Sequence, residues 1–208
     1  MKTLRVNEMF VSLQGEGHRV GTSNFFIRLS GCNLTCTKEG EAGFDCDTEF
    51  TSGSNMTIMD IEKTMDDLLE KDGCVNPKNI IWTGGEPSMQ FLKDQEIPEY
   101  FHQNGYFQSI ETNGTIDFDP SQFDFISCSP KSAEHTMRIQ HANELRYVRS
   151  VGQSIPKPTI QAEHHFISPA FEADLTVHPM TMRYCITMVK TNPSWRLSVQ
   201  AHKLWKVQ

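Results

Sequence analysis

The sequence predicts an α/β fold with a parallel sheet and helical crossovers. Apolar segments of strand length alternate with amphipathic segments of helical period, which is the pattern of repeated strand–helix units. Polar, glycine-bearing stretches directly follow the strand segments. Because the carboxyl ends of parallel strands meet at one edge of a sheet, these stretches are expected to form one ligand site. The 208 residues contain no linker-like stretch, so we expect a single domain over residues 1–208.

Two apolar segments near the start of the chain are expected to be strands. Residues 5–13 end at a polar, glycine-bearing turn, and residues 24–29 are almost continuously apolar, as in a strand buried on both faces. Arg28 interrupts this second run. An unpaired buried guanidinium is costly, so we expect Arg28 to be shielded from water and to pair with an acid or hold an anionic ligand.

The clearest helix covers residues 57–71, where apolar side chains recur at helical spacing between a capping threonine and a glycine stop. A second helix is expected over residues 88–104, interrupted by Pro98, and a third over residues 176–190. The remaining chain is expected to contribute strands at residues 79–82, 106–110, 123–128, 144–149, 164–167 and 195–199.

Composition excludes several classes of function. The formal net charge is −7 and no basic cluster is present, which argues against direct binding of nucleic acid. No apolar run is long enough to span a membrane. The opening residues lack a signal-peptide pattern, so we expect a cytoplasmic protein whose thiols stay reduced. A small-molecule substrate is therefore expected.

Three cysteines lie within fifteen residues, at Cys32, Cys36 and Cys46. An odd number would leave one thiol outside a disulfide, and a structural zinc would need a fourth ligand that no nearby residue supplies. Three thiolates with one open position suit a [4Fe–4S] cluster that keeps one iron free. The spacing alone does not decide between a cluster and scattered packed cysteines. The other three cysteines are expected to be packed rather than reactive: Cys74, Cys128 and Cys185.

Several ordered motifs resemble one enzyme family. The cysteine triplet followed later by Gly84-Gly85-Glu86-Pro87 is similar to the radical S-adenosylmethionine enzymes, and further motifs are similar to the 7-carboxy-7-deazaguanine synthases. The motifs run in order from residue 7 to residue 203. They include Leu13-Gln14-Gly15-Glu16-Gly17, Gly31-Cys32-Asn33-Leu34, Cys46-Asp47-Thr48, Glu111-Thr112-Asn113-Gly114, Ser129-Pro130-Lys131 and Trp195-Arg196-Leu197-Ser198-Val199-Gln200.

The resemblance implies a shortened, modified partial (β/α) barrel of the radical S-adenosylmethionine type, usually a homodimer. It implies a [4Fe–4S] cluster on Cys32, Cys36 and Cys46. The usual family spacing is three residues and then two, whereas the second gap in this chain has nine. Asp45 occupies the position of a usual aromatic residue, and Phe44 precedes it.

The resemblance also implies a set of binding residues. Thr48 would bind Mg²⁺ through its hydroxyl. The pterin substrate would contact Leu13, Gln14, Gly15, Glu16, Arg28, Thr83 and the C-terminal Gln208. S-adenosylmethionine would contact Phe44, Asp45, Gly85, Glu86, Glu111, Asn113, Ser129, Pro130, Lys131, Ser168, Pro169, Ala170 and Phe171.

The implied reaction is radical ring contraction of 6-carboxy-5,6,7,8-tetrahydropterin to 7-carboxy-7-deazaguanine with loss of ammonia. A flavodoxin- or ferredoxin-like protein would supply the electron. Two alternatives remain open from the residues: a radical activase that makes a glycyl radical on a protein partner, and a zinc-binding module without catalysis.

Simpler roles remain open for individual residues. Arg28 could form an ion pair with Glu16, and Thr48 could cap a turn. Glu111 and Asn113 could only shape a turn, and Glu86 could be a solvated loop acid.

Overall fold

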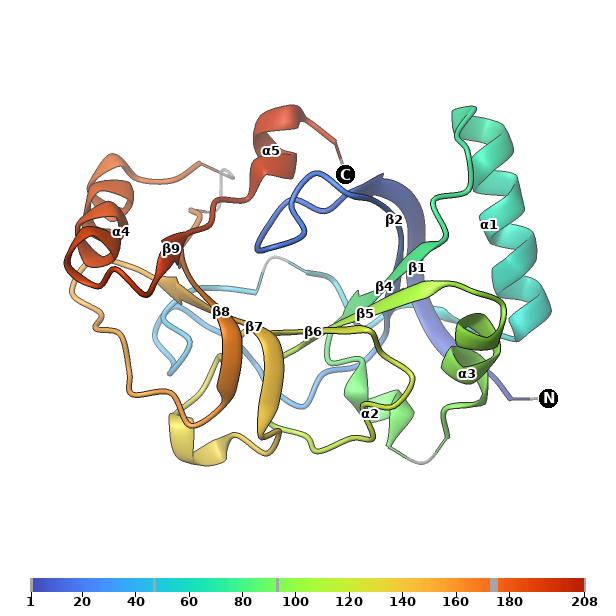
Figure 1. Ribbon diagram of the computed structural model, residues 1–208, viewed down its shortest axis with the longest axis horizontal. Helices are drawn as coiled ribbons and strands as arrows, with labels where there is room; N and C mark the ends of the chain where they lie inside the picture. Colours follow the sequence, from blue (N-terminus) through green and yellow to red (C-terminus); the bar gives the residue numbers. More distant parts are fainter. Residues whose placement is uncertain (1, 47, 93, 173–175, 208) are drawn as a thin grey trace.

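The sheet of this protein is curved and open. The computed structural model describes residues 2–46, 48–92, 94–172 and 176–207. Within these ranges, nine strands form one sheet in the order β3-β1-β2-β4-β5-β6-β7-β8-β9. The strands that follow β2 in this sheet order, from β4 to β9, pair in parallel with their neighbours. Figure 1 shows the sheet curving between its two edges, β3 and β9, without closing. This agrees with the expected α/β class and partial barrel.

The strands and helices have the following bounds. The strands are β1 (Leu4–Leu13), β2 (Ser23–Leu29), β3 (Ser54–Met56), β4 (Asn79–Gly84), β5 (Phe107–Thr112), β6 (Phe125–Cys128), β7 (His141–Arg149), β8 (Gln161–Pro169) and β9 (Arg196–Leu197). The helices are α1 (Ile58–Asp72), α2 (Ser88–Phe91), α3 (Glu96–Gln103), α4 (Pro179–Thr191) and α5 (Ala201–Trp205), with a 3₁₀ turn η1 (Glu134–Thr136).

The first strand departs from the expected parallel arrangement. β1 runs antiparallel to both β2 and β3. Only the loop of residues 14–22 joins β1 to β2, and a connection this short can make an antiparallel hairpin but not a helical crossover. The end of β1 therefore lies at the amino ends of the parallel strands, opposite to the edge where residues 14–17 were expected. The short polar strand β3 was not expected either.

The β1–β2 loop (residues 14–22) nevertheless reaches the interior because it crosses the open side of the sheet. The backbone N–H of Gly17 donates to Ser198 Oγ at 2.9 Å, and the N–H of Ala201 donates to the carbonyl of Gly15 at 2.9 Å. These bonds join the start of the chain to the segment after β9. The loop thus crosses the open side of the sheet to reach the segment that follows the edge strand β9 (Figure 1).

The strands bury one face in the core and turn the other towards a pocket. In β2, Phe25 and Ile27 are fully buried, while Phe26 and Arg28 line the pocket. The expectation that this strand is buried on both faces was therefore wrong. The run appears continuous in sequence because Phe26 adds an apolar ring to the pocket wall, where it stacks on Phe10 with 5.0 Å between ring centroids.

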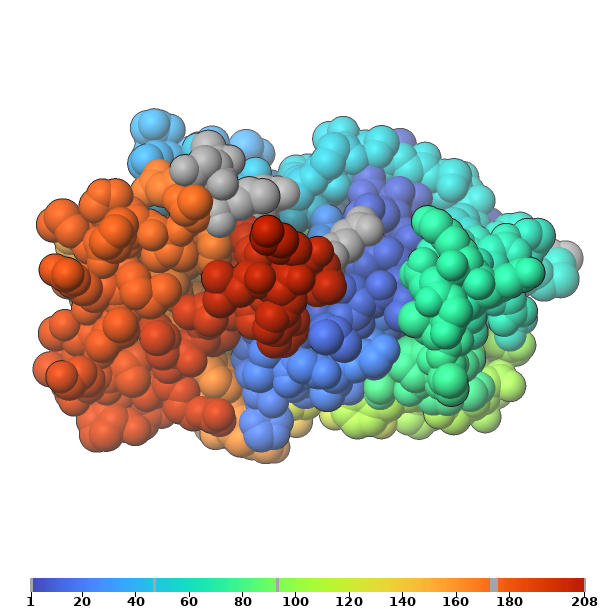
Figure 2. Space-filling model, turned by 90° about the horizontal axis from the view of Figure 1, so that it is seen from above, coloured from blue at the N-terminus to red at the C-terminus, as the bar shows by residue number. Residues whose placement is uncertain are grey.

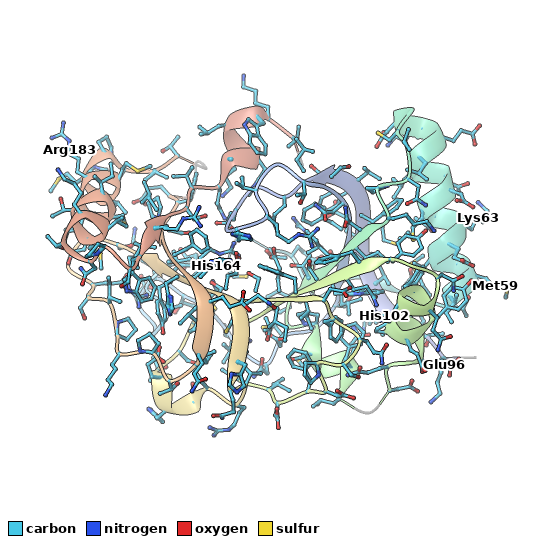
Figure 3. The ribbon with its side chains drawn as sticks, in the orientation of Figure 1. Met59, Lys63, Glu96, His102, His164 and Arg183 are labelled. Atoms are coloured by element: carbon cyan, nitrogen blue, oxygen red, sulfur yellow. The ribbon has the colours of Figure 1, made fainter. Side chains whose placement is uncertain are left out.

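Helix α1 forms as predicted. The Thr57 hydroxyl accepts from the N–H of Asp60, whose carboxylate accepts from the N–H of Thr57, and Gly73 ends the helix in the left-handed conformation at φ 63°. α1 packs on β1 and β3, and α4 packs on β8 and β9. Figure 3 shows Lys63 of α1 and Arg183 of α4 pointing away from the sheet.

The expected helix over residues 88–104 is divided into α2 and α3. Pro98 does not interrupt it. It lies in the first turn of α3, where a missing backbone N–H costs no intrahelical hydrogen bond. The last expected strand, residues 195–199, is reduced to β9, and the unexpected helix α5 follows it.

A buried amide group holds the middle of the sheet together. The side chain of Gln108 in β5 is fully buried. Its Oε1 accepts from Trp82 Nε1 at 2.8 Å. Its Nε2 donates to the carbonyls of Pro98 at 2.8 Å and Gln122 at 2.9 Å. One side chain therefore links β4, α3 and the segment before β6.

Replacing this amide should destabilise the fold. Gln108→Leu keeps the approximate volume but leaves one buried donor and two carbonyls without partners, so the free energy of unfolding should fall by about 2–4 kcal/mol. Urea denaturation followed by circular dichroism measures this. The matched control is Gln103→Leu on the exposed surface of α3, which should change stability by less than about 0.5 kcal/mol. Equal midpoints for the two variants would contradict the linking role.

Candidate active site

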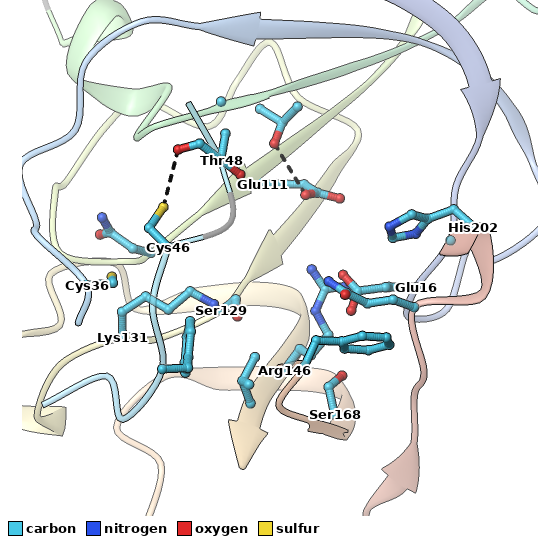
Figure 4. A pocket seen from close by; sticks show the side chains of 18 of the residues that line it. Glu16, Cys36, Cys46, Thr48, Glu111, Ser129, Lys131, Arg146, Ser168 and His202 are labelled. Carbon is cyan, nitrogen blue, oxygen red and sulfur yellow. Dashed lines mark hydrogen bonds and ion pairs between the residues drawn. The ribbon is translucent and has the colours of Figure 1, made fainter. Parts of the chain in front are cut away.

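One pocket of about 830 Å³ lies where the parallel strands end. Its walls come from β2, β4, β5, β6, β7 and β8, from the β1–β2 loop, from the cysteine loop (residues 32–46) and from α5. Figure 4 shows side chains from these elements pointing into one space. In Figure 2, α5 lies over the middle of this face, between the two halves of the chain.

The three clustered cysteines all line this pocket. Their thiols are free, with Cys32 and Cys36 half-buried and Cys46 exposed. Burial raises the pKa of the Cys32 and Cys36 thiols. The N–H of Cys46 donates to the carbonyl of Cys36 at 3.3 Å, which closes the base of the enlarged loop of nine residues between them. The enlarged loop therefore leaves the two flanking cysteines close together.

Backbone hydrogen bonds fix both ends of the cysteine loop. The N–H of Gly31 donates to the carbonyl of Phe50 at 2.7 Å, and the N–H of Glu86 donates to the carbonyl of Gly31 at 2.8 Å. A Cβ at Gly85 would overlap the Gly31 carbonyl oxygen. The glycine pair after β4 thus lets this strand end approach the cysteine loop closely.

Glu49 holds the segment after Thr48 and was missed by the sequence analysis. Its carboxylate accepts from the N–H groups of Thr51 and Ser52 at 2.7 and 2.9 Å and from Asn7 Nδ2 at 2.6 Å. The side-chain hydrogen bonds lower the pKa of Glu49. No sequence motif marked this residue, because its partners lie in β1 and in its own turn.

Glu86 is buried behind the pocket wall rather than exposed to a ligand. Its side chain is 1% exposed. Its carboxylate accepts from Ser88 Oγ at 2.6 Å, Thr112 Oγ1 at 2.7 Å and the N–H of Asn113 at 2.6 Å. Burial raises the pKa of Glu86. The alternative of a solvated loop acid is therefore wrong.

The wall beside the cysteine loop carries a cation over an aromatic ring. Lys131 Nζ lies 5.0 Å from the centroid of the Phe44 ring and donates to Ser129 Oγ at 2.7 Å. Asp45 accepts from the backbone N–H of Lys38 at 2.9 Å, so it stabilises the loop itself. Phe44, the neighbour of Asp45, thereby presents its ring to this side of the pocket.

The opposite wall is rich in hydrogen-bonding groups. Gln14 Nε2 donates to Glu111 Oε1 at 2.8 Å, and Thr83 Oγ1 donates to Glu111 Oε2 at 3.4 Å. Glu111 therefore faces the pocket and does more than shape a turn. Asn113 does shape a turn, since its Oδ1 accepts from the N–H of Thr115 at 2.9 Å.

Arg28 pairs with an acid as expected, but it is neither shielded from water nor paired with Glu16. Its side chain is 32% exposed, so it is not shielded from water. Its acidic partner is Glu8, at 3.6 Å on the neighbouring strand, and not Glu16. Glu16 is 3.3 Å from Arg146 instead. The antiparallel pairing of β1 with β2 explains this, because it places Glu8 directly opposite Arg28.

The pocket collects most of the predicted residues. Its lining includes the three cysteines, Thr48, Leu13, Gln14, Gly15, Glu16, Arg28, Thr83, Phe44, Asp45, Gly85, Glu111, Asn113, Ser129, Lys131, Ser168, Pro169 and Phe171. Glu86, Pro130 and Ala170 adjoin it without belonging to the lining. Gln208 lies outside the described residues.

Several lining residues were not predicted. Arg146, Gln200 and His202 face the pocket from β7 and from the region of α5. The sequence could have marked Arg146 in the same way as Arg28. It is a charged residue inside an apolar strand segment, between Leu145 and Tyr147.

Comparison with known proteins identifies the family. No family profile matches the chain. The 7-carboxy-7-deazaguanine synthase of Bacteroides thetaiotaomicron is 35% identical over 201 residues, which cover 96% of each chain. The synthase of the same name from Haemophilus influenzae is 35% identical and covers 95% of this chain and 90% of its own. The chain belongs to the 7-carboxy-7-deazaguanine synthase family.

Family membership confirms the resemblance drawn from the motifs. The chain is a radical S-adenosylmethionine enzyme of the lyase class that belongs to 7-deazaguanine biosynthesis. The crystal structure of QueE from Escherichia coli superimposes with a TM-score of 0.64 at 22% identity, covering 96% of this chain and 95% of the other. This likeness confirms the open α/β fold. Within the part of the chain that is described, no helix is long and apolar enough to cross a membrane.

The exposure of the thiols predicts their order of alkylation in the metal-free protein. Cys46 and Cys74 are exposed and should react first with iodoacetamide at pH 8. Cys32 and Cys36 should follow, because burial raises the pKa of their thiols and lowers the thiolate fraction. Cys128 and Cys185 should react last, since both are buried and the pKa of Cys185 is raised to about 11.

Peptide mass spectrometry over time measures this order. Raising the pH from 8 to 10 should accelerate the labelling of Cys185, because its raised pKa keeps most of the thiol protonated at pH 8. The expectation that Cys74 is packed is already corrected by its exposure. Early labelling of Cys128 would contradict the buried position of its thiol.

Proposed function

We propose that this protein converts 6-carboxy-5,6,7,8-tetrahydropterin to 7-carboxy-7-deazaguanine with loss of ammonia. The observation that carries the proposal is one pocket that joins three free cysteines at one wall to acids and an arginine at the other. Its volume of about 830 Å³ suits two small molecules bound side by side. Membership of the synthase family supports the same reaction.

The donor set fits a [4Fe–4S] cluster on Cys32, Cys36 and Cys46. Among the described residues, no three His, Cys, Asp or Glu side chains converge closely enough to hold one metal ion. Cluster thiolates bind different irons and do not need to meet at one point. When bound, the cluster and S-adenosylmethionine supply a radical that abstracts hydrogen from the substrate.

The chain's own residues bind and orient the two ligands. Phe44 offers an aromatic face for adenine, and the Ser129 and Lys131 pair offers donors beside it. Glu86 acts indirectly, since its buried carboxylate holds the backbone of Asn113 in position. The Ser168–Phe171 turn completes this side of the wall as a proposed S-adenosylmethionine contact.

On the substrate side, Arg28 binds the carboxylate of the pterin. Its guanidinium is held over the Phe10 ring at 5.2 Å and keeps donors for a ligand beyond its 3.6 Å contact with Glu8. Glu111, held by Gln14, offers acceptors for the ring N–H groups. Thr48 offers a hydroxyl to Mg²⁺, whose other ligands come from substrate and water.

Further parts of the proposal concern the whole protein. We expect a single domain, because one sheet connects residues 4–197. We expect a cytoplasmic homodimer that receives its electron from a flavodoxin- or ferredoxin-like protein. The glycyl-radical activase and the zinc-binding module remain as alternatives that the following experiment separates.

Anaerobic reconstitution with iron and sulfide tests the function. The reconstituted protein should be brown, and with S-adenosylmethionine, reductant and the pterin it should form 7-carboxy-7-deazaguanine, identified by mass spectrometry. Cys32→Ala, Cys36→Ala or Cys46→Ala should abolish cluster and product, because each thiolate holds one iron. Cys74→Ala is the matched control and should retain both.

A colourless protein that binds zinc would establish the binding module. A brown protein that cleaves S-adenosylmethionine without converting the pterin would favour the activase. Cluster assembly in Cys46→Ala but not in Cys74→Ala would show that the ligand assignment is wrong.

Substitution of Arg28 tests the carboxylate contact. Arg28→Lys keeps the charge but loses the planar fork. The side chain is 32% exposed, so water weakens this hydrogen bond. The binding free energy lost should therefore be at the low end for a charged hydrogen bond, about 1–1.5 kcal/mol. This corresponds to about a five- to tenfold rise in the pterin Kd. S-adenosylmethionine affinity should stay constant. Arg196→Lys, on the exposed side of β9, is the control. Equal pterin affinity in both variants would assign Arg28 to the Glu8 ion pair alone.

A further inference from the structure

Three buried polar atoms that line the pocket have no hydrogen-bond partner among the described residues. They are Arg146 Nη1, Ser168 Oγ and Gln200 Oε1. Buried polar atoms are almost always paired, since leaving them unpaired is costly. These three residues line the same pocket, which makes this part of the wall a candidate contact for a ligand. Only Arg146 among the three carries a charge.

The position of Arg146 directs its guanidinium towards the pocket. Its neighbours Leu145 and Tyr147 are 0% and 1% exposed and belong to the core. Because side chains alternate along a strand, Arg146 lies on the other face of β7. It is only 4% exposed. Its charge is thus held deep in the pocket rather than at the rim.

Two carboxylates hold this guanidinium without using all of its donors. Arg146 Nη1 lies 3.3 Å from Glu16 Oε2 and 3.6 Å from Glu144 Oε1. Neither contact has the geometry of a hydrogen bond, so Nη1 has no hydrogen-bond partner among the described residues. Burial opposes the charge, but the negative charges of Glu16, Glu111 and Glu144 together raise the pKa of Arg146. The side chain therefore stays charged.

Glu144 is fixed from its other side. Its Oε1 accepts from Ser127 Oγ at 2.6 Å, and its Oε2 accepts from the backbone N–H of His18 at 2.7 Å. The ring of His18 stacks on that of His164 with 3.9 Å between centroids. His164, labelled in Figure 3, is half-buried. Arg146 is thus anchored to a rigid acid and cannot rotate freely.

Glu16 and Arg146 together present an acceptor beside a donor. Both line the pocket, and Figure 4 shows the carboxylate and the guanidinium next to each other. A lactam group has the complementary pair, a carbonyl oxygen next to a ring N–H. We propose that Arg146 donates to the 4-oxo oxygen of the pterin while Glu16 accepts from its N3–H. This inference rests on the proposed function and adds Arg146 as a specificity-determining residue.

The proposal predicts a sharp preference for the lactam. A 2,4-diaminopteridine replaces the oxo acceptor by an amino donor and the N3–H donor by an acceptor. Arg146, a donor, would then face the amino donor, and Glu16, an acceptor, would face the acceptor at N3. The wild-type protein should bind 6-carboxy-5,6,7,8-tetrahydropterin about 10- to 100-fold more tightly than its 2,4-diamino analogue, as expected when charged hydrogen bonds are lost.

The experiment measures the Kd of both pteridines with the reconstituted protein under anaerobic conditions. Arg146→Met should weaken lactam binding and reduce the preference several-fold, because the donor to the 4-oxo oxygen is lost while the contact of Glu16 with N3–H remains. Arg146→Lys should restore most of the preference, since an ammonium can still donate. S-adenosylmethionine affinity should be unchanged in each variant. Arg149→Met, on the same strand but outside the pocket lining, should bind both pteridines as the wild type does.

Arg146→Met leaves Glu144 buried without its cation, so this variant could fail to fold. The second variant, Arg146→Met with Glu144→Gln, removes that imbalance and should show the same lost preference. Equal weakening of both pteridines and of S-adenosylmethionine would show a structural role and overturn the inference. Retention of the full preference in the double variant would overturn it as well. A wild-type protein that binds neither pteridine would refute the proposed function itself, and the inference with it.

Discussion

The buried carboxylate of Glu86 is the contact on which the arrangement of the site depends. It accepts hydrogen bonds from Ser88 at the start of α2 and from Thr112 and Asn113 at the end of β5. The N–H of the same residue donates to Gly31 at the start of the cysteine loop. Three segments far apart in sequence thus meet at one residue, and the cysteine wall is fixed relative to the strand ends.

Charge is distributed unevenly around the pocket. Near the cysteines, the positively charged Lys131 side chain lies over the Phe44 ring and donates a hydrogen bond to Ser129. At the far wall, Glu16 and Glu111 face the space with Arg146 beneath them. This arrangement separates the wall proposed for S-adenosylmethionine from the wall proposed for a nitrogen-rich ring. A ligand that carries several N–H donors and few positive charges suits the second wall.

The open edge of the barrel explains how distant segments complete that second wall. A closed barrel would have no gap between its first and last strands, whereas here the β1–β2 loop crosses the gap. A Cβ at Gly15 would overlap the ring of His202, so glycine is what allows this loop to lie against α5. The catalytic pocket thus depends on a hairpin that does not belong to the parallel part of the sheet.

The amino-acid sequence alone predicted the class of fold and the family, and it supplied the proposed cysteine ligand set. Local signals carried these conclusions: strand–helix alternation, cysteine spacing, the Thr57 cap and ordered motifs all act over short stretches of chain. Most of the candidate site followed as well, because residues after parallel strands must share one edge. Residues 14–16 line the pocket, although the position expected for them at that edge was wrong.

Tertiary structure alone decided which charges pair. Arg28 faces Glu8 because β1 is antiparallel, and Glu16 faces Arg146 because the hairpin loop crosses the open barrel. The packing of the chain also decided exposure: it buried Glu86 behind the pocket wall and left Cys74 on the surface. Such outcomes depend on contacts between residues more than a hundred positions apart, as with Glu16 and Arg146. No local pattern encodes these contacts, since strand direction and loop path are properties of the whole packed chain.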